Sequence, residues 1–266
     1  MTSPIGVFDS GLGGLSVAAR ILQSLPNERI IYFADTAHVP YGERSFEEIQ
    51  QFSLGITRFL IEKGVKAVVA ACNLSSAVAL TKVRETWPDL PILGVIEPGA
   101  RAAVSASNGD PIGVLATTGA IRSRAYDKAI ARLDGAIKVT GQACPKFVPL
   151  VESGLAESDQ ANAAAREYVA GLLRVGCSTI VLGCTHYPFL MKAIRLAAGE
   201  GVDIIDPAQE TANELGNILI TRNMASDGLE FAHEFYSSGD SSGFMALGSK
   251  FLGREIDTVT RVDIEN

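Results

Sequence analysis

The sequence contains two similar halves, and this internal repeat restricts the chain to folds built from two related domains. Residues 4–7 recur as residues 111–114, and residues 68–73 are echoed by residues 180–185. Two more matches follow in the same order, Val39-Pro40 with Val148-Pro149 and Ile96-Glu97-Pro98 with Ile205-Asp206-Pro207. All four offsets lie between 107 and 112 residues. We therefore expect two similar α/β domains related by a pseudo-twofold axis, with equivalent residues facing a cleft between them.

Short β-branched runs alternate with longer amphipathic segments, which is typical of α/β domains with parallel sheets. We expect strands at residues 5–8, 30–34, 67–71, 92–95, 112–115 and 179–182, with a further one around Ile137 and Val139. Helices are expected through Leu25 and over residues 46–63, 75–86 and 161–175. Gly64 and Gly176 stand where two of these helices should end.

The repeat also predicts the domain boundaries. The first domain comprises residues 1–97 and 208–266, and the second comprises residues 98–207. The last 59 residues are too few for a third half, so we expect them to complete the first domain. They should supply a helix over residues 208–223, edge strands near residues 231–237 and 258–264, and a loop over residues 237–243.

Composition excludes several classes of protein. A chain of 266 residues with 47% hydrophobic and 20% charged residues is globular and long enough for two domains. A net charge of −7 argues against nucleic-acid binding, which normally needs a basic face. We find neither a signal peptide at the N-terminus nor an apolar run of the about 18 residues that a membrane span requires. Four cysteines suit free thiols in a cytoplasmic, reducing setting.

Chemically active residues follow the expected strands. Ligands of open α/β sheets bind beyond the carboxyl ends of the strands, and in each half polar residues gather there. They are Asp9-Ser10 and Cys72-Asn73 after the first and third strands, Thr117 and Cys184-Thr185-His186 at the equivalent places, and Tyr41-Gly42 and Glu152 after the second strand of each half. Small polar donors together with two thiols suit an anionic substrate.

Each candidate also has a purely structural interpretation. A cysteine after an apolar strand is usually an inert small hydrophobic residue, and we interpret Cys144 and Cys177 in that way. Cys72 and Cys184 differ because they are equivalent in the repeat and polar residues follow both, so we assign them as reactive. On the structural interpretation, Asp9 has no role beyond capping the N-terminus of its helix, and His186 has none beyond a structural hydrogen bond.

Two kinds of ligand are not expected. The Gly-rich turn at residues 11–14 lacks the G-x-G-x-x-G spacing of a dinucleotide loop. Three scattered histidines with unpaired cysteines do not form a metal site. The sequence thus predicts neither a metal nor a cofactor.

Several of these positions resemble the glutamate racemases, which belong to the cofactor-independent aspartate/glutamate racemase superfamily. The resembling segments are residues 6–15, 34–42, 94–100, 147–152, 182–188 and 235–240. The resemblance implies racemisation of glutamate, which supplies D-glutamate for peptidoglycan, with Cys72 and Cys184 as the two acid/base thiols. It implies that Asp9, Glu152 and His186 assist. With Thr117 added from the strand ends, the expected substrate-binding residues are Asp9, Ser10, Tyr41, Gly42, Asn73, Leu74, Thr117, Thr185 and His186.

Three residues depart from the family's pattern. Leu74 and Ala120 stand where the family has threonines, and Lys146 where it usually has an apolar residue. Leu74 keeps its backbone N–H but offers no hydroxyl, which could weaken or retune carboxylate binding. Two alternatives therefore stay open, a racemase of aspartate or another amino acid, and a weakly catalytic binding or regulatory protein. The small-molecule amino acid is the expected partner, without membrane contact, and a homodimer is left open.

Overall fold

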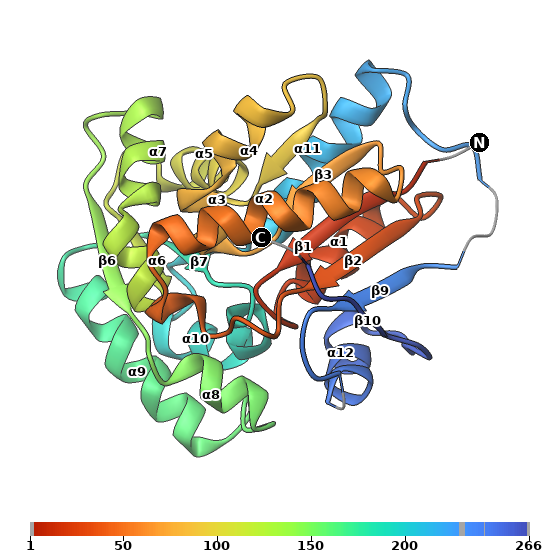
Figure 1. Ribbon diagram of the computed structural model, residues 1–266. Coiled ribbons are helices and arrows are strands. Elements are labelled where there is room, and N and C mark those ends of the chain that lie inside the picture. The colour runs from red at the N-terminus through yellow and green to blue at the C-terminus, as the bar shows by residue number, and fades with distance from the viewer. Residues whose placement is uncertain (1–2, 229–231, 242, 265–266) are drawn as a thin grey trace. The chain divides into compact units, whose positions relative to one another are not determined.

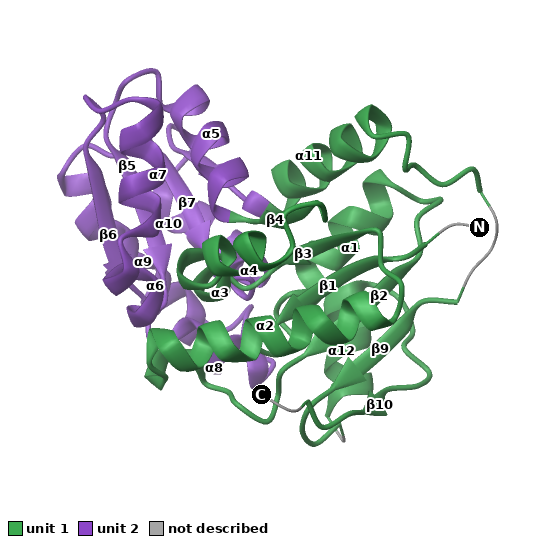
Figure 2. Ribbon diagram, turned by 45° about the horizontal axis from the view of Figure 1, so that its top comes forward, with its two compact units in different colours: residues 1–95, 208–266 green, residues 96–207 purple. Residues whose placement is uncertain are grey.

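The computed structural model describes residues 3–228, 232–241 and 243–264, and these form two compact units. Unit 1 comprises residues 1–95 and 208–266, and unit 2 comprises residues 96–207 (Figure 2). The first boundary follows Val95, whereas the sequence interpretation placed it after Glu97. The reason is helix α5 (Ile96–Ser107), whose first turn would be cut by a boundary after Glu97. Both units are α/β with parallel sheets, which confirms the predicted fold class.

The described part of unit 1 is built on a six-stranded sheet with the order β10-β9-β2-β1-β3-β4. Figure 1 labels all of these strands except β4. Its strands are β1 (Ile5–Asp9), β2 (Ile30–Ala34), β3 (Ala67–Ala70), β4 (Ile92–Gly94), β9 (Glu234–Ser237) and β10 (Thr260–Arg261). Its helices are α1 (Leu15–Ser24), η1 (Tyr41–Glu43), α2 (Phe46–Glu62), α3 (Asn73–Val78), α4 (Leu80–Thr86), α11 (Pro207–Thr221) and α12 (Phe244–Leu252).

Unit 2 is built on a four-stranded parallel sheet with the order β6-β5-β7-β8. Its strands are β5 (Ile112–Ala116), β6 (Val139–Ala143), β7 (Thr179–Gly183) and β8 (Asp203–Ile205). Besides α5, its helices are α6 (Thr118–Ser123), α7 (Ala125–Leu133), α8 (Phe147–Glu152), α9 (Asp159–Arg174), η2 (Tyr187–Leu190) and α10 (Met191–Ala198). The order matches β2-β1-β3-β4 of unit 1, so the sequence repeat is also a repeat of topology.

Strand register makes the two strand-end cysteines equivalent. Phe8 of β1 pairs with Ala70 of β3, and its repeat counterpart Leu115 of β5 pairs with Leu182 of β7. Cys72 and Cys184 each lie two residues beyond these partners. The backbone pairing therefore places both thiols at the same position relative to their central strands.

One of the four sequence matches is wrong as a structural equivalence. Ile96 lies in the first turn of α5, whereas Ile205 is the last residue of β8. Strand pairing instead makes Ile92 the counterpart of Ile204. The string lies in the first turn of α5, but it spans the end of β8 and the first residue of α11 in the second half.

A glycine on each central strand sets how closely the covering helix packs. A Cβ at Gly6 would lie 3.0 Å from Leu60 Cδ1 of α2, and a Cβ at Gly113 would lie 2.7 Å from Leu172 Cδ1 of α9. At contacts this short the leucine side chain, or the helix that carries it, would have to shift. The same glycine–leucine contact thus recurs in both units.

The two predicted helix stops are confirmed. Gly64 and Gly176 have φ values of +77° and +78°, the left-handed conformation that glycine adopts without steric cost. Val65 N–H donates to Leu60 O, and Cys177 N–H donates to Leu172 O, at 3.4 and 3.2 Å. This is the Schellman arrangement, whose last residue is usually apolar. Cys177 therefore fills the structural place that Val65 fills in unit 1.

The C-terminal segment returns to unit 1 as expected, with differences in detail. The helix predicted over residues 208–223 is α11, and the strand predicted near residues 231–237 begins at Glu234, with Phe231 outside the described residues. The segment 258–264 contains only the two residues of β10. The sequence interpretation missed α12, because it assigned a loop to residues 237–243 (Ser242 lies outside the described part) and no element to residues 244–252. In the structure, Gly248 faces Leu15 of α1, where a Cβ would lie 3.1 Å from Leu15 Cδ1.

Two smaller predictions also change. The helix predicted over residues 75–86 is two helices, α3 and α4, which meet at Ala79. The strand expected around Ile137 and Val139 is β6, which starts at Val139. Among the described helices, none combines the length and hydropathy needed to cross a bilayer.

The helix stop of α9 can be tested with a matched pair of variants. A Cβ at Gly176 or at Gly201 would meet nothing within 4 Å, but only Gly176 has a left-handed φ. We expect Gly176→Ala to lower the free energy of unfolding by about 1 kcal/mol in urea titrations, because a left-handed L-residue costs roughly 1–2 kcal/mol. Gly201→Ala should leave it unchanged or slightly higher. Equal effects would contradict the assignment of the stop to backbone conformation.

Candidate active site

Asp9 is held rigidly at the carboxyl end of β1. Its side chain is 1% exposed, and Asp9 Oδ2 accepts a hydrogen bond from Gly11 N–H at 3.0 Å. A Cβ at Gly14 would lie 2.5 Å from Asp9 Cβ, so only glycine lets the start of α1 pack here. The N-cap of α1 is Gly14, and no side chain caps this helix. Asp9 is therefore not an N-cap, and its buried carboxylate serves another purpose.

Cys72 is the N-cap residue of α3 and lies beside Asp9. Burial, followed by the negative charge of Asp9, raises the pKa of the Cys72 thiol to about 11. Hydrogen bonds from the backbone and hydroxyl of Ser75 and from the hydroxyl of Ser10 act in the opposite direction. Cys72 is thus a protonated thiol near neutral pH, with three donors ready to stabilise its thiolate. Ser75 lies one helical turn after Cys72.

Cys184 directly follows β7 and is joined to an imidazole and a carboxylate. Cys184 Sγ lies 3.9 Å from His186 Nδ1, and His186 Nε2 lies 3.2 Å from Glu152 Oε1 at the end of α8. When Nε2–H donates to Glu152, Nδ1 is the acceptor that can take the thiol proton. The structure thus brings together three residues that the sequence selected from two separate segments.

The two thiols have equal exposure but different acid/base neighbours. Both are 8% exposed. Strand register makes Ala116 the counterpart of Asp9, so Cys184 has no carboxylate at that position. Leu74 likewise occupies the position that His186 has beside Cys184. Each unit therefore places one ionisable residue beside its thiol, Asp9 beside Cys72 and His186 beside Cys184. These two residues occupy different positions in the repeat.

A buried tyrosine in unit 2 was missed by the sequence interpretation. Burial raises the pKa of Tyr126 on α7, and the charges of Asp206 and Cys184 raise it further. The phenol therefore remains a neutral hydrogen-bonding group close to Cys184. No sequence signal marks it, because Tyr126 lies within a helix, far along the chain from both neighbours.

The remaining two cysteines fit structural roles. Cys144 follows β6, its Sγ donates to Gln142 O at 3.4 Å, and burial raises its pKa. Cys177 ends the Schellman turn of α9, and burial also raises its pKa. All four cysteines are free. The described residues contain no group of three or more His, Cys, Asp or Glu side chains that could hold a metal ion.

Most of the expected substrate-binding residues lie at or shortly after a strand end of their own unit, whereas Tyr41 and Gly42 lie in η1. Asn73 begins α3, and Thr185 is buried between Cys184 and His186. Thr117 is the N-cap of α6, where its hydroxyl oxygen accepts Ala120 N–H at 3.4 Å and keeps its hydrogen for donation. Tyr41 is buried, and its hydroxyl donates to Asp35 Oδ2 at 2.6 Å. A Cβ at Gly42 would meet nothing within 4 Å, so the backbone there is open to a ligand.

Two of the three departures have packing explanations. The Leu74 side chain is 4% exposed and belongs to an apolar cluster with Tyr41, Ile49, Phe52 and Cys72. Its side chain therefore packs in the same cluster as the Cys72 thiol. Lys146 Nζ forms an exposed ion pair with Glu167 Oε2 of α9 at 2.6 Å. The third departure, Ala120, donates its N–H to the capping Thr117.

Comparisons with known proteins agree on one family. The Asp/Glu/Hydantoin racemase family matches residues 5–215. The glutamate racemase of Geobacter metallireducens is 43% identical over 265 residues, covering 98% of this chain and 97% of the relative. The chain belongs to the glutamate racemase family. It is an amino-acid racemase, and hence an isomerase. The glutamate racemase of Acidothermus cellulolyticus is 44% identical, covering 97% of this chain and 98% of that relative.

Solved structures of this racemase family have the same fold. The RacE1 isoform of glutamate racemase from Bacillus anthracis superposes with a TM-score of 0.93 at 41% identity, over 98% of this chain and 97% of that one. The Francisella tularensis glutamate racemase, solved in complex with D-glutamate, gives 0.92 at 33% identity, over 98% of both chains. Allantoin racemase from Klebsiella pneumoniae, at 20% identity and a TM-score of 0.64, over 92% of this chain and 99% of that one, shares the fold alone.

The environment of Cys72 predicts its reactivity toward an alkylating reagent. Because burial and Asp9 raise its pKa to about 11, alkylation of Cys72 by iodoacetamide should still be accelerating at pH 10. Removing the charge with Asp9→Asn should move this rise to lower pH, since the nearby negative charge disfavours the thiolate. Peptide mass spectrometry of each cysteine measures the rates. The assignment would be contradicted if the alkylation rate of Cys72 had its pH midpoint at about 8.5, the ordinary pKa of a cysteine thiol, and Asp9→Asn did not move it.

Proposed function

We propose that this racemase interconverts L- and D-glutamate by a two-base mechanism in which Cys72 and Cys184 act on opposite faces of the α-carbon. The supporting observation is that register-equivalent thiols follow β3 and β7, each with its own ionisable partner. The substrate follows from the relatives named glutamate racemase and from the relative solved with D-glutamate.

In the L-to-D direction, Cys184 is the base and Cys72 is the acid. His186 takes the proton of Cys184 at Nδ1, with Glu152 holding its Nε2–H, and the resulting thiolate removes the α-proton. Cys72, with its raised pKa, is a protonated donor for the other face. In the D-to-L direction the roles reverse: the Cys72 proton passes to the neighbouring Asp9 carboxylate, and the donors from Ser10 and Ser75 stabilise the Cys72 thiolate. The two thiols must hold opposite protonation states, so their titrations are coupled.

The carbanionic intermediate needs stabilisation from the chain's own groups. Hydrogen-bond donors aimed at the α-carboxylate, where charge develops, can supply it. The donors at the strand ends are the hydroxyls of Ser10, Thr117 and Thr185 and the amide of Asn73. This mechanism calls for no cofactor. It does require both sulfur atoms to reach one α-carbon.

The biological role follows from the product. We propose that the D-glutamate formed supplies peptidoglycan synthesis, and that the enzyme works in the cytoplasm. Four free cysteines support a reducing compartment, since thiols persist there.

Substituting the cysteines one by one tests the two-base assignment. Cys72→Ala and Cys184→Ala should each abolish racemisation of L- and D-glutamate, followed by circular dichroism, because each removes the acid or base for one face. Cys177→Val, which copies Val65 at the equivalent helix end, should retain most activity, as should Cys144→Ala. Full racemisation by either of the first two variants would sink the assignment. A panel of other L-amino acids, run alongside, measures substrate choice.

Isotope incorporation tests the direction of proton transfer. In deuterated water, D-glutamate formed from L-glutamate should carry deuterium at Cα, because the exchanged Cys72 thiol delivers it to the opposite face. Unreacted L-glutamate should remain largely unlabelled early in the reaction. Mass spectrometry of the separated enantiomers measures both. Equal labelling of the two enantiomers from the outset would indicate a single base.

A further inference from the structure

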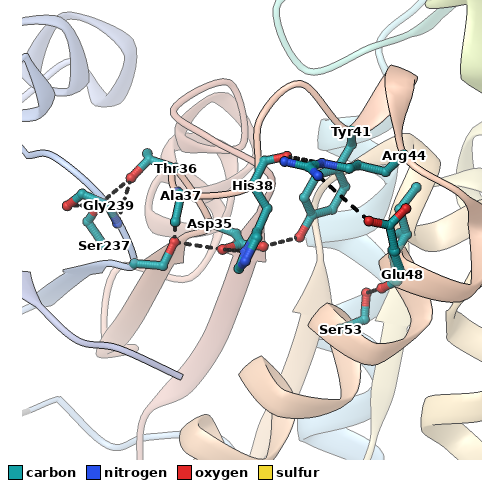
Figure 3. A network of polar contacts seen from close by, with 12 residues as sticks. Asp35, Thr36, Ala37, His38, Tyr41, Arg44, Glu48, Ser53, Ser237 and Gly239 are labelled. Carbon is teal, nitrogen blue, oxygen red and sulfur yellow. Dashed lines mark hydrogen bonds and ion pairs between the residues drawn. The ribbon is translucent and has the colours of Figure 1, made fainter. Parts of the chain in front are cut away.

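Asp35 joins three segments of unit 1 through one buried carboxylate (Figure 3). It directly follows β2 and is 2% exposed. Its Oδ2 accepts the hydroxyl of Tyr41 at 2.6 Å, and its Oδ1 accepts the hydroxyl of Ser238 at 2.6 Å and Nδ1–H of His38 at 2.8 Å. An ionised carboxylate only accepts hydrogen bonds, so all three side chains donate to it.

On one side the network reaches the segment that contains Gly42. Burial, followed by the charge of Asp35, raises the pKa of Tyr41 and keeps its phenol a donor. The Tyr41 ring packs near Phe52, at 5.9 Å between centroids, in the cluster that contains Cys72. His38 stacks on the same Phe52 ring at 3.9 Å. Asp35 thus determines where the Tyr41 side chain is held.

On the other side the network reaches the segment after β9, more than 200 residues along the chain. Ser238 Oγ accepts Ala37 N–H at 3.0 Å while donating to Asp35. Gly239 N–H donates to Thr36 Oγ1 at 3.0 Å, and a Cβ at Gly239 would lie 2.8 Å from Ala37 N. These contacts explain Ser237-Ser238-Gly239, in the resembling segment 235–240, which has no part in the proposed reaction. It holds the loop after β2 against the sheet.

We infer that Asp35 is a positioning residue, which fixes Tyr41 and hence the Gly42 backbone against the Ser238 segment so that this backbone can bind the substrate. The inference rests on the proposed function for the ligand. Asp35 acts on the reaction through Tyr41, so its loss weakens ground state and transition state alike. Such uniform binding changes KM more than kcat.

Asp35→Asn tests the network because an amide presents two N–H donors to side chains that are themselves donors. We expect KM for L-glutamate to rise about tenfold, which corresponds to about 1.4 kcal/mol, while kcat changes less than about threefold. Tyr41→Phe removes one of the same bonds and should have a similar effect. The double variant should resemble either single variant, because residues in one network are not additive. Ser238→Ala serves where Asp35→Asn folds poorly.

Glu28 provides a matched control just before the amino end of β2, whereas Asp35 follows the carboxyl end of the same strand. It is also a buried carboxylate, accepting from Lys66 Nζ at 2.6 Å and from the N–H and hydroxyl of Ser226 at 2.8 Å. Glu28→Gln should lower thermal stability but leave KM unchanged. If Glu28→Gln and Asp35→Asn raise KM equally, or if Asp35→Asn leaves KM unchanged, Asp35 has no positioning role.

Hydrogen–deuterium exchange separates this inference from the proposed function. Peptides covering residues 36–43 should exchange faster in Asp35→Asn and Ser238→Ala than in wild type, and Glu28→Gln should not accelerate them. Wild-type protein that fails to racemise glutamate would overturn the proposed function, and the exchange experiment would still test the network. Unchanged exchange in both network variants would overturn the positioning role.

Discussion

Parallel pairing between the central strand of each unit and its neighbour is the constraint on which the site depends. In unit 1, β1 pairs with β3 so that Asp9 ends beside the residues leading into Cys72. In unit 2, the same pairing of β5 with β7 brings Cys184 to the equivalent point. A one-residue slip would turn the side chains of a strand to the opposite face. Gly6 and Gly113 let Leu60 of α2 and Leu172 of α9 pack closely on these central strands.

The repeat provides two similar backbones, and side-chain substitutions give the thiols different chemistry. Asp9 has Ala116 as its counterpart, and His186 has Leu74. Consequently Cys72 lies in a buried, negatively charged setting that favours its protonated form. Cys184 instead lies beside an imidazole that can accept a proton. A two-base reaction needs one thiolate and one thiol at a time, and this asymmetry offers a physical basis for that difference.

Polar contacts between residues far apart in the sequence organise the carboxyl ends of β2 and β9 in unit 1. Asp35 receives hydrogen bonds from Tyr41, His38 and Ser238, the last of them from the segment after β9. The C-terminal segment therefore does more than extend the sheet with β9 and β10. It holds the loop that leads to Tyr41 and Gly42, which couples the last fifth of the chain to the proposed substrate contacts.

The sequence by itself determined features that depend on local pattern. The repeat, the parallel α/β class, the helix ends at Gly64 and Gly176, and the positions of Cys72 and Cys184 after strands could all be predicted, because strand ends and turn glycines leave local signals. Tertiary structure alone decided which side chains surround each thiol. Tyr126 and the Asp35 network were missed, and the Ile96 match was wrong. These features depend on packing between segments far apart in sequence, and no local pattern encodes which distant side chain will meet a buried sulfur or carboxylate.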